Sequence, residues 1–337
     1  MFDNNSTIDL NGKTVLITGG TGSFGRQFSE TLLKRYKLRK LIILSRDEHK
    51  QYDMQQSAVF ADREELRYFL GDVRDVDRLR MAMRGVDCVV HAAALKHVPA
   101  AEYNPFECIR TNVYGAENVI SAAIDVGVEK VIALSTDKAV NPINIYGASK
   151  LASDKLFVAA NTLAGDSPTR FSVVRYGNVL GSRGSIVPLI RRLVEGGCES
   201  IPLTDERMTR FWITLVQGID FVLSSAKIMK GGEIFVPKVP SMTVADMMEA
   251  LAPGIPREIV GIRPGEKLHE LLISEDDTAA VVERDGRYVI CPAQDPSVQA
   301  AHEAEGAQVA PSDFHYASNT NEEWLDGDGL VKLLAQI

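Results

Sequence analysis

The stretch Thr14-Val-Leu-Ile-Thr-Gly19-Gly-Thr-Gly22-Ser-Phe-Gly25 decides the fold that this sequence is expected to adopt. Its first five residues are apolar or β-branched, as in a buried strand, and a helical pattern follows the last glycine. Gly19, Gly22 and Gly25 follow a G-x-x-G-x-x-G spacing, a variant of the dinucleotide-binding fingerprint. The first glycine allows the tight turn, the second lets the backbone approach a pyrophosphate, and the third lets the helix pack on the strand. Because the amides and dipole at a helix start favour phosphate, we expect a phosphate-binding turn rather than an ordinary glycine-rich loop.

Strand-like and helix-like segments alternate along the first half of the chain. This alternation is typical of the α/β class with a doubly wound parallel Rossmann sheet. A late strand at 232–237, followed by a helix over 244–251, is expected to join the same sheet. The earlier strand-like segments lie near residues 14–18, 41–44, 67–70, 87–91, 130–135 and 171–175.

The late strand implies two domains that are interleaved in sequence. We predict a Rossmann domain, which binds the cofactor, over 12–180 and about 212–240. A smaller α/β substrate domain takes about 181–211 and 241–337 and includes a C-terminal arm. The polar part of this arm, roughly 293–322, is expected to be mobile or to contact another copy of the chain.

Composition limits the classes of function. With 337 residues, 45% hydrophobic and 24% charged, the chain is typical of a globular protein with a large core. The formal net charge of −8 argues against a nucleic-acid partner. No apolar run approaches the ~18 residues of a membrane span, and no signal peptide is recognised, so we expect no membrane partner and a cytoplasmic location. The four cysteines lack metal-ligand or disulfide spacing, and no metal is expected.

The second strand ends in Ser45-Arg46-Asp47-Glu48, which bears on the choice of cofactor. Sites that prefer NAD usually place a carboxylate at this strand end to accept the ribose hydroxyl. Ser45 and Arg46 come first here and suit a phosphate better, so NADP is favoured, although Asp47 is close enough to leave the register open. The turn, the strand ends and a later Tyr-Lys pair supply the cofactor contacts that we expect. These are Gly19, Thr21, Gly22, Ser23, Phe24, Gly25, Ser45, Arg46, Lys50, Asp72, Val73, Ala92, Ala93, Tyr146 and Lys150.

The chemistry is carried by Ser135-Thr-Asp-Lys-Ala139, just ahead of Tyr146-Gly-Ala-Ser-Lys150. On a helix, residues four apart share a face, so the ammonium of Lys150 can lie near the phenol of Tyr146. A free tyrosine has a pKa of about 10, and a nearby positive charge favours the phenolate. The Thr136 hydroxyl can share the hydrogen bond to a substrate alcohol.

Asp137 and Lys138 add an acid and a potential base on the same loop. A simple alcohol dehydrogenase has no use for this pair, whereas an enzyme that eliminates water does. An unperturbed lysine has a pKa of about 10.4, so Lys138 can act as a base only if burial or nearby cations depress that pKa. Because consecutive residues of an extended chain point to opposite sides, the loop must twist for both side chains to face one substrate.

With Arg175-Tyr-Gly-Asn178, these motifs resemble the extended short-chain dehydrogenases/reductases. The segments 91–97, 102–105, 207–212 and 262–270 make the chain more similar to the inverting UDP-N-acetylglucosamine 4,6-dehydratases of the pseudaminic acid pathway. The resemblance covers most of residues 12–273.

The resemblance implies a UDP-sugar substrate, a recycled NADP and a homo-oligomer, from dimer to hexamer. It implies that Tyr146, tuned by Lys150, removes the C4 hydroxyl proton, that Lys138 removes the C5 proton, and that Asp137 protonates the departing C6 hydroxyl. Thr136, Asp137, Lys138, Tyr146 and Lys150 are therefore the expected catalytic residues. The expected substrate-binding residues are Lys96, Asn178, Arg210, Arg263 and Glu266.

Several alternatives stay open from the sequence. A dehydratase that retains the C5 configuration or a nucleotide-sugar 4-epimerase would use the same cofactor and tyrosine. A non-catalytic NADP-binding sensor is a remoter alternative, since such proteins commonly lose the Tyr-Lys pair. Arg210 suits either a phosphate or the solvated surface or ion-pair role of an ordinary arginine, and Asn112 suits either the active site or a structural hydrogen bond.

Overall fold

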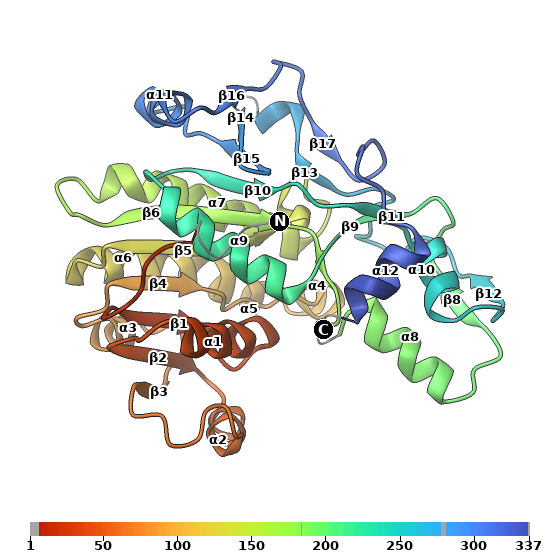
Figure 1. Ribbon diagram of the computed structural model, residues 1–337, viewed down its shortest axis with the longest axis horizontal. Coiled ribbons are helices and arrows are strands. Elements are labelled where there is room, and N and C mark those ends of the chain that lie inside the picture. The colour runs from red at the N-terminus through yellow and green to blue at the C-terminus, as the bar shows by residue number, and fades with distance from the viewer. Residues whose placement is uncertain (1–6, 183, 278–280, 336–337) are drawn as a thin grey trace.

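A ten-stranded sheet forms the larger part of the chain that the computed structural model describes, which is residues 7–182, 184–277 and 281–335 (Figure 1). Strands β3, β2, β1, β4, β5, β6 and β10 are parallel neighbours in that order. Strands β15, β14 and β16 continue the β10 edge with antiparallel pairing. From one edge to the other, the strands are β16 (Gln308–Val309), β14 (Val281–Arg284), β15 (Arg287–Ile290), β10 (Ile234–Pro237), β6 (Arg170–Tyr176), β5 (Lys130–Thr136), β4 (Cys88–His91), β1 (Thr14–Thr18), β2 (Lys40–Ser45) and β3 (Leu66–Leu70).

Helices cover both faces of this sheet, as a parallel sheet of buried apolar strands requires. On one face α1 (Ser23–Arg35) and α9 (Leu215–Ile228) lie side by side. On the other face α3 (Val76–Ala82), α6 (Gly115–Val126) and α7 (Ile145–Leu163) form a row. α2 (Glu48–Gln56) follows β2, and α4 (Val98–Tyr103), α5 (Pro105–Ile109) and the π-helical turn η2 (Arg110–Tyr114) lie between β4 and α6.

The order of the parallel strands reverses between β1 and β4. At such a reversal the loops after the two strands diverge and leave a crevice at the carboxyl end of the sheet. The glycine turn follows β1, and Ala92 and Ala93 follow β4. The predicted fold class, a doubly wound parallel Rossmann sheet, is confirmed, and its crevice lies beside the predicted phosphate-binding turn.

A smaller part lies beyond the carboxyl ends of the parallel strands, on the right of Figure 1. It contains the sheet β11-β9-β7 and the pair β12-β8, packed with α8, α10 and α12 around apolar clusters of their own. A further pair, β13 with β17, joins it to the C-terminal segment. The bounds are β7 (Asn178–Val179), α8 (Ile186–Glu195), β8 (Ile201–Leu203), β9 (Thr209–Ile213), β11 (Ser241–Thr243), α10 (Val244–Leu251), β12 (Arg257–Ile259), β13 (Leu271–Ile273), β17 (Tyr316–Ala317) and α12 (Gly327–Leu334).

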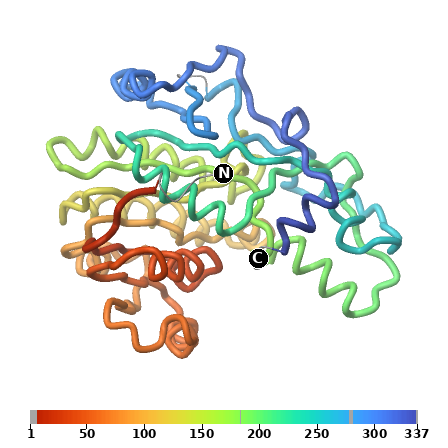
Figure 2. Tube along the Cα trace, viewed as in Figure 1, coloured from red at the N-terminus to blue at the C-terminus, as the bar shows by residue number. Residues whose placement is uncertain are grey.

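The C-terminal segment departs from the expected boundaries. Residues 281–309 belong to the large sheet rather than to the substrate domain, because β14 and β15 form a hairpin that pairs with β10. Asp285 and Gly286 at its tip have φ of 47° and 70°, as a two-residue type I′ turn requires. The polar segment 293–322 is not a detached arm, since it contains α11 (Pro296–Ala304), β16 and β17. Figure 2 shows this segment passing from the sheet edge to the smaller part; residues 278–280 and 336–337 of the expected substrate domain lie outside the described residues.

Candidate active site

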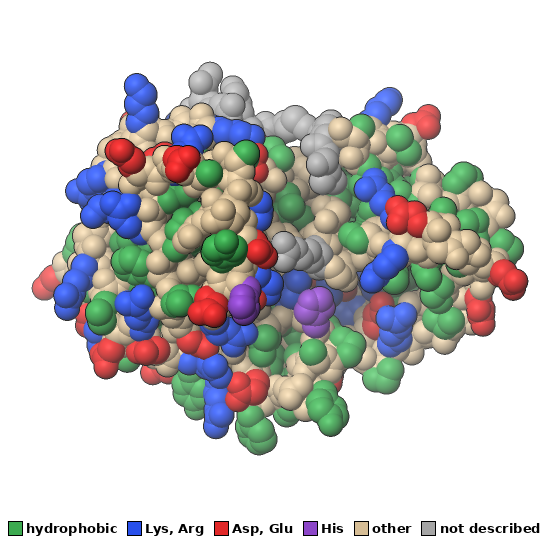
Figure 3. All heavy atoms as spheres, turned by 90° about the horizontal axis from the view of Figure 1, so that it is seen from below, with side chains coloured by type: hydrophobic (Ala, Val, Ile, Leu, Met, Phe, Trp, Pro, Cys, Tyr) green, Lys and Arg blue, Asp and Glu red, His purple; other side chains and the backbone are tan. Residues whose placement is uncertain are grey.

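A cavity of about 980 Å³ lies between the carboxyl end of the parallel sheet and the smaller part. Figure 3, seen from below, shows the surface hollowed between these two parts. Its wall includes all the cofactor and substrate residues predicted from the sequence, and every predicted catalytic residue except Asp137. Segments 251 residues apart, at Gly19 and Glu270, therefore meet around one space.

The glycine turn fits the diphosphate of a dinucleotide. Gly19 has a φ of +66°, and a Cβ added there would lie 2.9 Å from the Cα of Ala93. A Cβ on Gly25 would lie 2.5 Å from the Cα of Gly20, so helix and strand can approach this closely only without a side chain. Gly22 caps α1 without a side-chain hydrogen bond, and no acidic residue occupies the first helical turn. The helix start is thus left available to an anion.

The end of β2 offers a hydroxyl and a guanidinium to the cofactor. Ser45 and Thr21 are buried and share a hydrogen bond of 2.8 Å between their hydroxyl oxygens. Asp47 caps α2 by accepting from the Lys50 amide at 3.0 Å and pairs with the Lys50 ammonium at 2.7 Å. Arg46 is exposed and lies 3.6 Å from Asp72. The Asp47 carboxylate, which the sequence left as a possible partner of the ribose hydroxyl, is therefore engaged in capping α2.

Tyr146 and Lys150 both lie on α7 and are buried. Lys150 donates a hydrogen bond of 2.8 Å to the carbonyl of Leu134, and burial lowers its pKa. Burial raises the pKa of Tyr146 to about 12, while the charge of Lys138 and the Thr136 hydroxyl act in the opposite direction. The tuning of the Tyr146 phenol by Lys150 stays a prediction.

The loop after β5 twists as its two charged residues require. It forms a 3₁₀ turn, η3 (Asp137–Ala139), in which the Lys138 amide donates a hydrogen bond to the Thr136 hydroxyl. Asp137 is fully buried behind the cavity wall and accepts hydrogen bonds from the Thr136 hydroxyl at 2.8 Å and from the Lys138 ammonium at 3.1 Å. Thr136 and Lys138 themselves line the cavity. Asp137 can therefore reach a substrate only through these two neighbours.

Lys138 is held as an ammonium rather than prepared as a free base. Its Nζ lies 3.1 Å from Asp137, 3.4 Å from Glu270 and 3.4 Å from the Asn178 side-chain oxygen. Burial opposes its charge, but the carboxylates of Asp137 and Glu270 outweigh burial and raise the pKa of Lys138. The condition set from the sequence, a depressed pKa of Lys138, is not met in this arrangement, because the nearest charges are acidic.

The expected substrate residues divide into two groups. Lys96 and Arg263 are exposed on the cavity rim, where they can meet an anionic ligand. Arg210 is buried on β9 and donates hydrogen bonds to the carbonyls of Thr209, Lys267 and Leu268 at 2.7, 2.9 and 3.1 Å. These bonds favour a structural role for Arg210, because they hold the segment before β13 against β9.

Asn112, the other residue left open, has a structural role. Its side chain is buried, exchanges hydrogen bonds with the backbone of Leu95 at 2.8 and 3.0 Å, and donates to Ser149 at 2.9 Å. It therefore ties the loop after β4 to α7. No group of histidine, cysteine and acidic residues suited to a metal ion occurs within the described ranges.

Sequence reasoning missed Glu270 and Lys267. Both line the cavity, and Glu270 is 2% exposed. The available signal was an acidic residue directly before the apolar strand Leu271–Ile273, a position where a carboxylate is costly without a partner.

The Rossmann sheet, glycine turn and buried Tyr146–Lys150 pair define the class of extended short-chain dehydrogenases/reductases. A family described as "Polysaccharide biosynthesis protein" matches residues 15–292. The chain belongs to this family.

Two curated relatives show how functions vary among similar sequences. One is "UDP-N-acetylglucosamine 4,6-dehydratase (inverting)" of Campylobacter jejuni subsp. jejuni serotype O:23/36, 54% identical over 96% of this chain and 98% of the relative. The other is "UDP-glucose 4-epimerase" of Rickettsia akari, 45% identical over 82% of each chain.

Solved structures support the same fold. Pen from Bacillus thuringiensis is 36% identical with a TM-score of 0.88, over 98% of this chain and 99% of that chain. DesIV, a dTDP-glucose 4,6-dehydratase from Streptomyces venezuelae with NAD bound, is 26% identical with a TM-score of 0.66, over 76% and 86%. The helices of the described part include none that is both long and apolar enough to cross a membrane.

Proposed function

We propose that this protein is an inverting UDP-N-acetylglucosamine 4,6-dehydratase, which removes water from the sugar and yields the 4-keto-6-deoxy sugar with inverted C5. One observation carries the proposal. Thr136, Lys138 and Tyr146 line the same cavity as the phosphate-binding turn, with Asp137 directly behind them. The C. jejuni relative, similar over nearly its whole length, supports the choice of sugar.

The reaction divides between the bound nicotinamide and the side chains of the chain. A nicotinamide dinucleotide, held by its diphosphate at the glycine turn, would supply hydride acceptance from C4 and hydride return to C6. Tyr146 takes the C4 hydroxyl proton, with Thr136 sharing the hydrogen bond. The 4-keto group acidifies the C5 hydrogen, and Lys138 removes it as the C6 hydroxyl leaves.

Asp137 has the role of protonating the departing hydroxyl through its neighbours. It accepts hydrogen bonds from Lys138 and Thr136 on the same oxygen. A proton can therefore pass from Lys138 to Asp137 and through the Thr136 hydroxyl to the leaving oxygen, which departs as water. The proton taken from C5 then leaves in the water without a separate acid. When hydride returns to C6, C5 takes up a proton on its opposite face, which inverts this centre, and the proton removed from the C4 hydroxyl balances that uptake.

The same proposal includes the finer expectations from the sequence. NADP rather than NAD is favoured by Arg46 beside Ser45, with Asp47 engaged in capping α2. Lys96, Asn178, Arg263 and Glu266 would meet the nucleotide sugar, with Arg210 holding the wall behind them. We place the enzyme in the cytoplasm, as a homo-oligomer at the first step of pseudaminic acid synthesis and flagellin glycosylation.

A 4-epimerase is the second candidate, favoured by the epimerase names of the Rickettsia relatives. Incubation with UDP-N-acetylglucosamine separates the two, because a dehydratase product is lighter by one water and an epimerase product is not. Proton NMR of the fresh product then distinguishes inversion from retention at C5.

Replacing Lys138 with methionine tests the assignment of the C5 base. We expect Lys138→Met to oxidise C4, so that the absorbance of reduced nicotinamide accumulates, and to lose turnover by about 10²–10⁴-fold, the usual contribution of a general base. Stopped-flow absorbance and product mass report the two steps separately.

Lys155→Met is the matched control, since Lys155 is exposed on α7 outside the cavity wall. It should turn over like the wild type and show no accumulated reduced nicotinamide. Normal turnover by Lys138→Met would remove Lys138 from the mechanism.

A further inference from the structure

Glu270 is a buried carboxylate in the cavity wall that the reaction above does not use. It directly precedes β13 and is 2% exposed. Its backbone is fixed to the C-terminal segment, because its amide donates to the Ser318 hydroxyl at 2.9 Å and its carbonyl accepts from the Ser318 amide at 2.8 Å. The side chain is therefore held at the cavity rather than free to reach solvent.

The two oxygens of Glu270 face cations from three different segments. Oε1 lies 3.4 Å from Lys138 Nζ and 3.6 Å from Arg210 Nε. Oε2 lies 3.9 Å from Lys267 Nζ and is buried without a hydrogen-bond partner in the described part of the chain. This carboxylate is surrounded by positive charge yet poorly hydrogen-bonded.

Lys138 faces two carboxylates, and they differ in how well their anions are held. Asp137 Oδ1 already accepts hydrogen bonds from both Thr136 and Lys138. Glu270 Oε1 contacts Lys138 only at ion-pair distance. Each carboxylate has one buried oxygen without a hydrogen-bond partner in the described part of the chain, Asp137 Oδ2 and Glu270 Oε2, so the two differ in the oxygen that faces Lys138. The other charged or titratable groups that act on Lys138, Arg210 and Lys96 among them, are cations, and Tyr146 is a weak acid. Of the two carboxylates, Glu270 is thus the better placed to accept a proton from Lys138.

We propose that Glu270 is the positioning residue that takes a proton from the Lys138 ammonium and so converts Lys138 into the base of the elimination step. This inference rests on the proposed function. An N–H bond of Lys138 breaks and an O–H bond of Glu270 forms, which leaves both side chains neutral. The lone pair on Nζ then takes the C5 proton, Lys138 passes a proton toward the leaving hydroxyl through Asp137 and Thr136, and Glu270 returns its proton to Lys138.

The electrostatics of the site act on this exchange in both directions. The carboxylates of Asp137 and Glu270 raise the pKa of Lys138, which opposes the transfer, and the raised pKa of Glu270 favours it. Burial raises the pKa of Glu270, and the charge of Asp137 adds to the rise, while Lys138, Arg210 and Lys267 oppose it. The exchange removes two opposite buried charges without moving a proton to solvent. Its extent therefore does not depend on bulk pH while the pair holds one proton between them.

The test is the pH dependence of turnover in Glu270→Gln with UDP-N-acetylglucosamine. The wild type should have a flat kcat between about pH 7 and 9, because the proton stays within the pair. In Glu270→Gln the proton of Lys138 must go to solvent, so kcat should fall about tenfold or more at pH 7 and rise about tenfold per pH unit. Glu270→Asp keeps a carboxylate and should restore a flat profile at a reduced rate.

Glu266→Gln is the matched control, because Glu266 lies on the same segment and faces Arg210 at 3.9 Å without pairing with Lys138. It should keep the flat profile even where its KM changes. Reduced nicotinamide should accumulate in Glu270→Gln at neutral pH, since C4 oxidation does not use this pair.

Two results would overturn the inference while leaving the proposed function intact. One is a kcat of Glu270→Gln that does not change with pH, whatever its magnitude. The other is faster turnover at every pH, which would mean that Glu270 only keeps Lys138 charged. If the variant does not fold, infrared difference spectra of the wild type during turnover decide, since a protonated carboxyl band should appear that Lys138→Met lacks, and its absence counts against Glu270. A wild type that releases no dehydrated sugar would instead refute the proposed function.

Discussion

Two buried glutamates of this molecule have pKa values shifted in opposite directions by their surroundings. Glu233 directly precedes β10, an inner strand of the large sheet, and Glu270 lies in the cavity wall; they are 0% and 2% exposed. Burial alone would raise the pKa of Glu233, but hydrogen bonds from His302, Ser172 and the Lys230 amide outweigh it and lower that pKa. At Glu270 burial prevails, and the pKa is raised.

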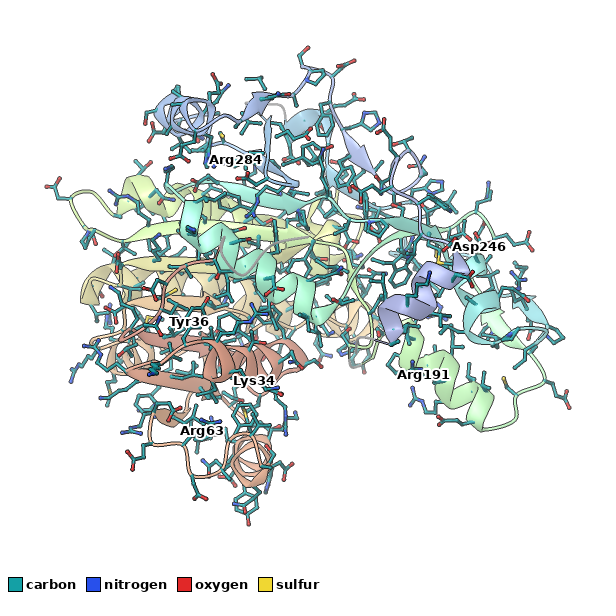
Figure 4. All side chains as sticks on the ribbon, in the orientation of Figure 1. Lys34, Tyr36, Arg63, Arg191, Asp246 and Arg284 are labelled. Carbon is teal, nitrogen blue, oxygen red and sulfur yellow. The ribbon has the colours of Figure 1, made fainter. Side chains whose placement is uncertain are left out.

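Hydrogen bonding explains the difference. The Glu233 carboxylate accepts from Ser172 at 2.6 Å, from the Gly231 amide at 2.8 Å and from His302 at 3.2 Å, as well as from the Lys230 amide. Arg284, labelled in Figure 4, donates to the other ring nitrogen of His302 at 3.0 Å, which leaves Nε2 to carry the hydrogen that Glu233 accepts. This cluster fastens α11 to the sheet, whereas Glu270 keeps a buried oxygen unpartnered.

The comparison teaches how a buried charge can be interpreted. A buried carboxylate whose oxygens all accept hydrogen bonds stabilises the fold. A buried carboxylate that lacks such bonds and lies next to a cavity can accept a proton during the reaction. Substitutions in the cavity should therefore lower turnover and leave the free energy of unfolding nearly unchanged. Substitutions at Glu233 should lower the free energy of unfolding and leave turnover nearly unchanged.

The largest effect is expected in the cavity, from Tyr146→Phe. Without the phenolic oxygen, no group takes the C4 hydroxyl proton, so the first step fails. Turnover should fall by about 10²–10⁴-fold, and no reduced nicotinamide should form in a single turnover, unlike in Lys138→Met. Stopped-flow absorbance with UDP-N-acetylglucosamine measures both.

The midpoint of thermal unfolding checks that this loss is chemical. It should stay near the wild-type value, because phenylalanine preserves the packing of the ring. Substantial formation of reduced nicotinamide in Tyr146→Phe would show that another base serves C4.

The next largest effect is expected in the cluster around Glu233, from Glu233→Gln. The side-chain amide would turn an NH₂ group toward donors that now converge on a carboxylate, and at least one buried amide would lose its acceptor. The free energy of unfolding should fall by about 2–4 kcal/mol, while kcat per folded molecule stays unchanged. Urea denaturation and turnover measured on the same samples provide the comparison.

Lowering the pH should reduce the difference in free energy of unfolding between the wild type and Glu233→Gln. Because the folded pKa of Glu233 is lowered, its contribution to stability is present above the unfolded carboxyl pKa of about 4.3 and is lost as pH falls through the folded pKa. Wild type and variant should therefore converge in acid. A gap that does not change with pH would mean that the loss comes from packing rather than from charge.

The sequence predicted the parallel sheet well because its signals are local. The turn at Gly19–Gly25, the alternating strands and the late strand at 232–237 each depend on neighbouring residues, and the structure has all of them. The β14–β15 hairpin was missed although Asp285-Gly286 between apolar residues is a hairpin signal. Its partner β10 lies more than 40 residues earlier in the chain, and nothing local states which edge a hairpin joins.

The site was predicted in composition but not in electrostatics. Spacing predicted Tyr146 and Lys150 on one face of a helix, and the motif at the end of β5 predicted Thr136 and Lys138 in the site; all four line the cavity. The pKa of Lys138 depends on Glu270, which is 132 residues away and reaches it only through the packing of β9 against the segment before β13. A sequence pattern carries no information on such a contact.

The smallest effect sharpens the comparison most, because Glu270→Gln is the same substitution as Glu233→Gln in the other setting. Removing a buried partner is usually costly because it strands a charge. Here Lys138 keeps Asp137 and Asn178, and Arg210 keeps its backbone carbonyls. We therefore expect the free energy of unfolding to change by no more than about 1 kcal/mol, measured by urea denaturation beside Glu233→Gln. A loss as large as that of Glu233→Gln would show that Glu270 is a structural ion-pair residue, and the contrast between the two glutamates would disappear.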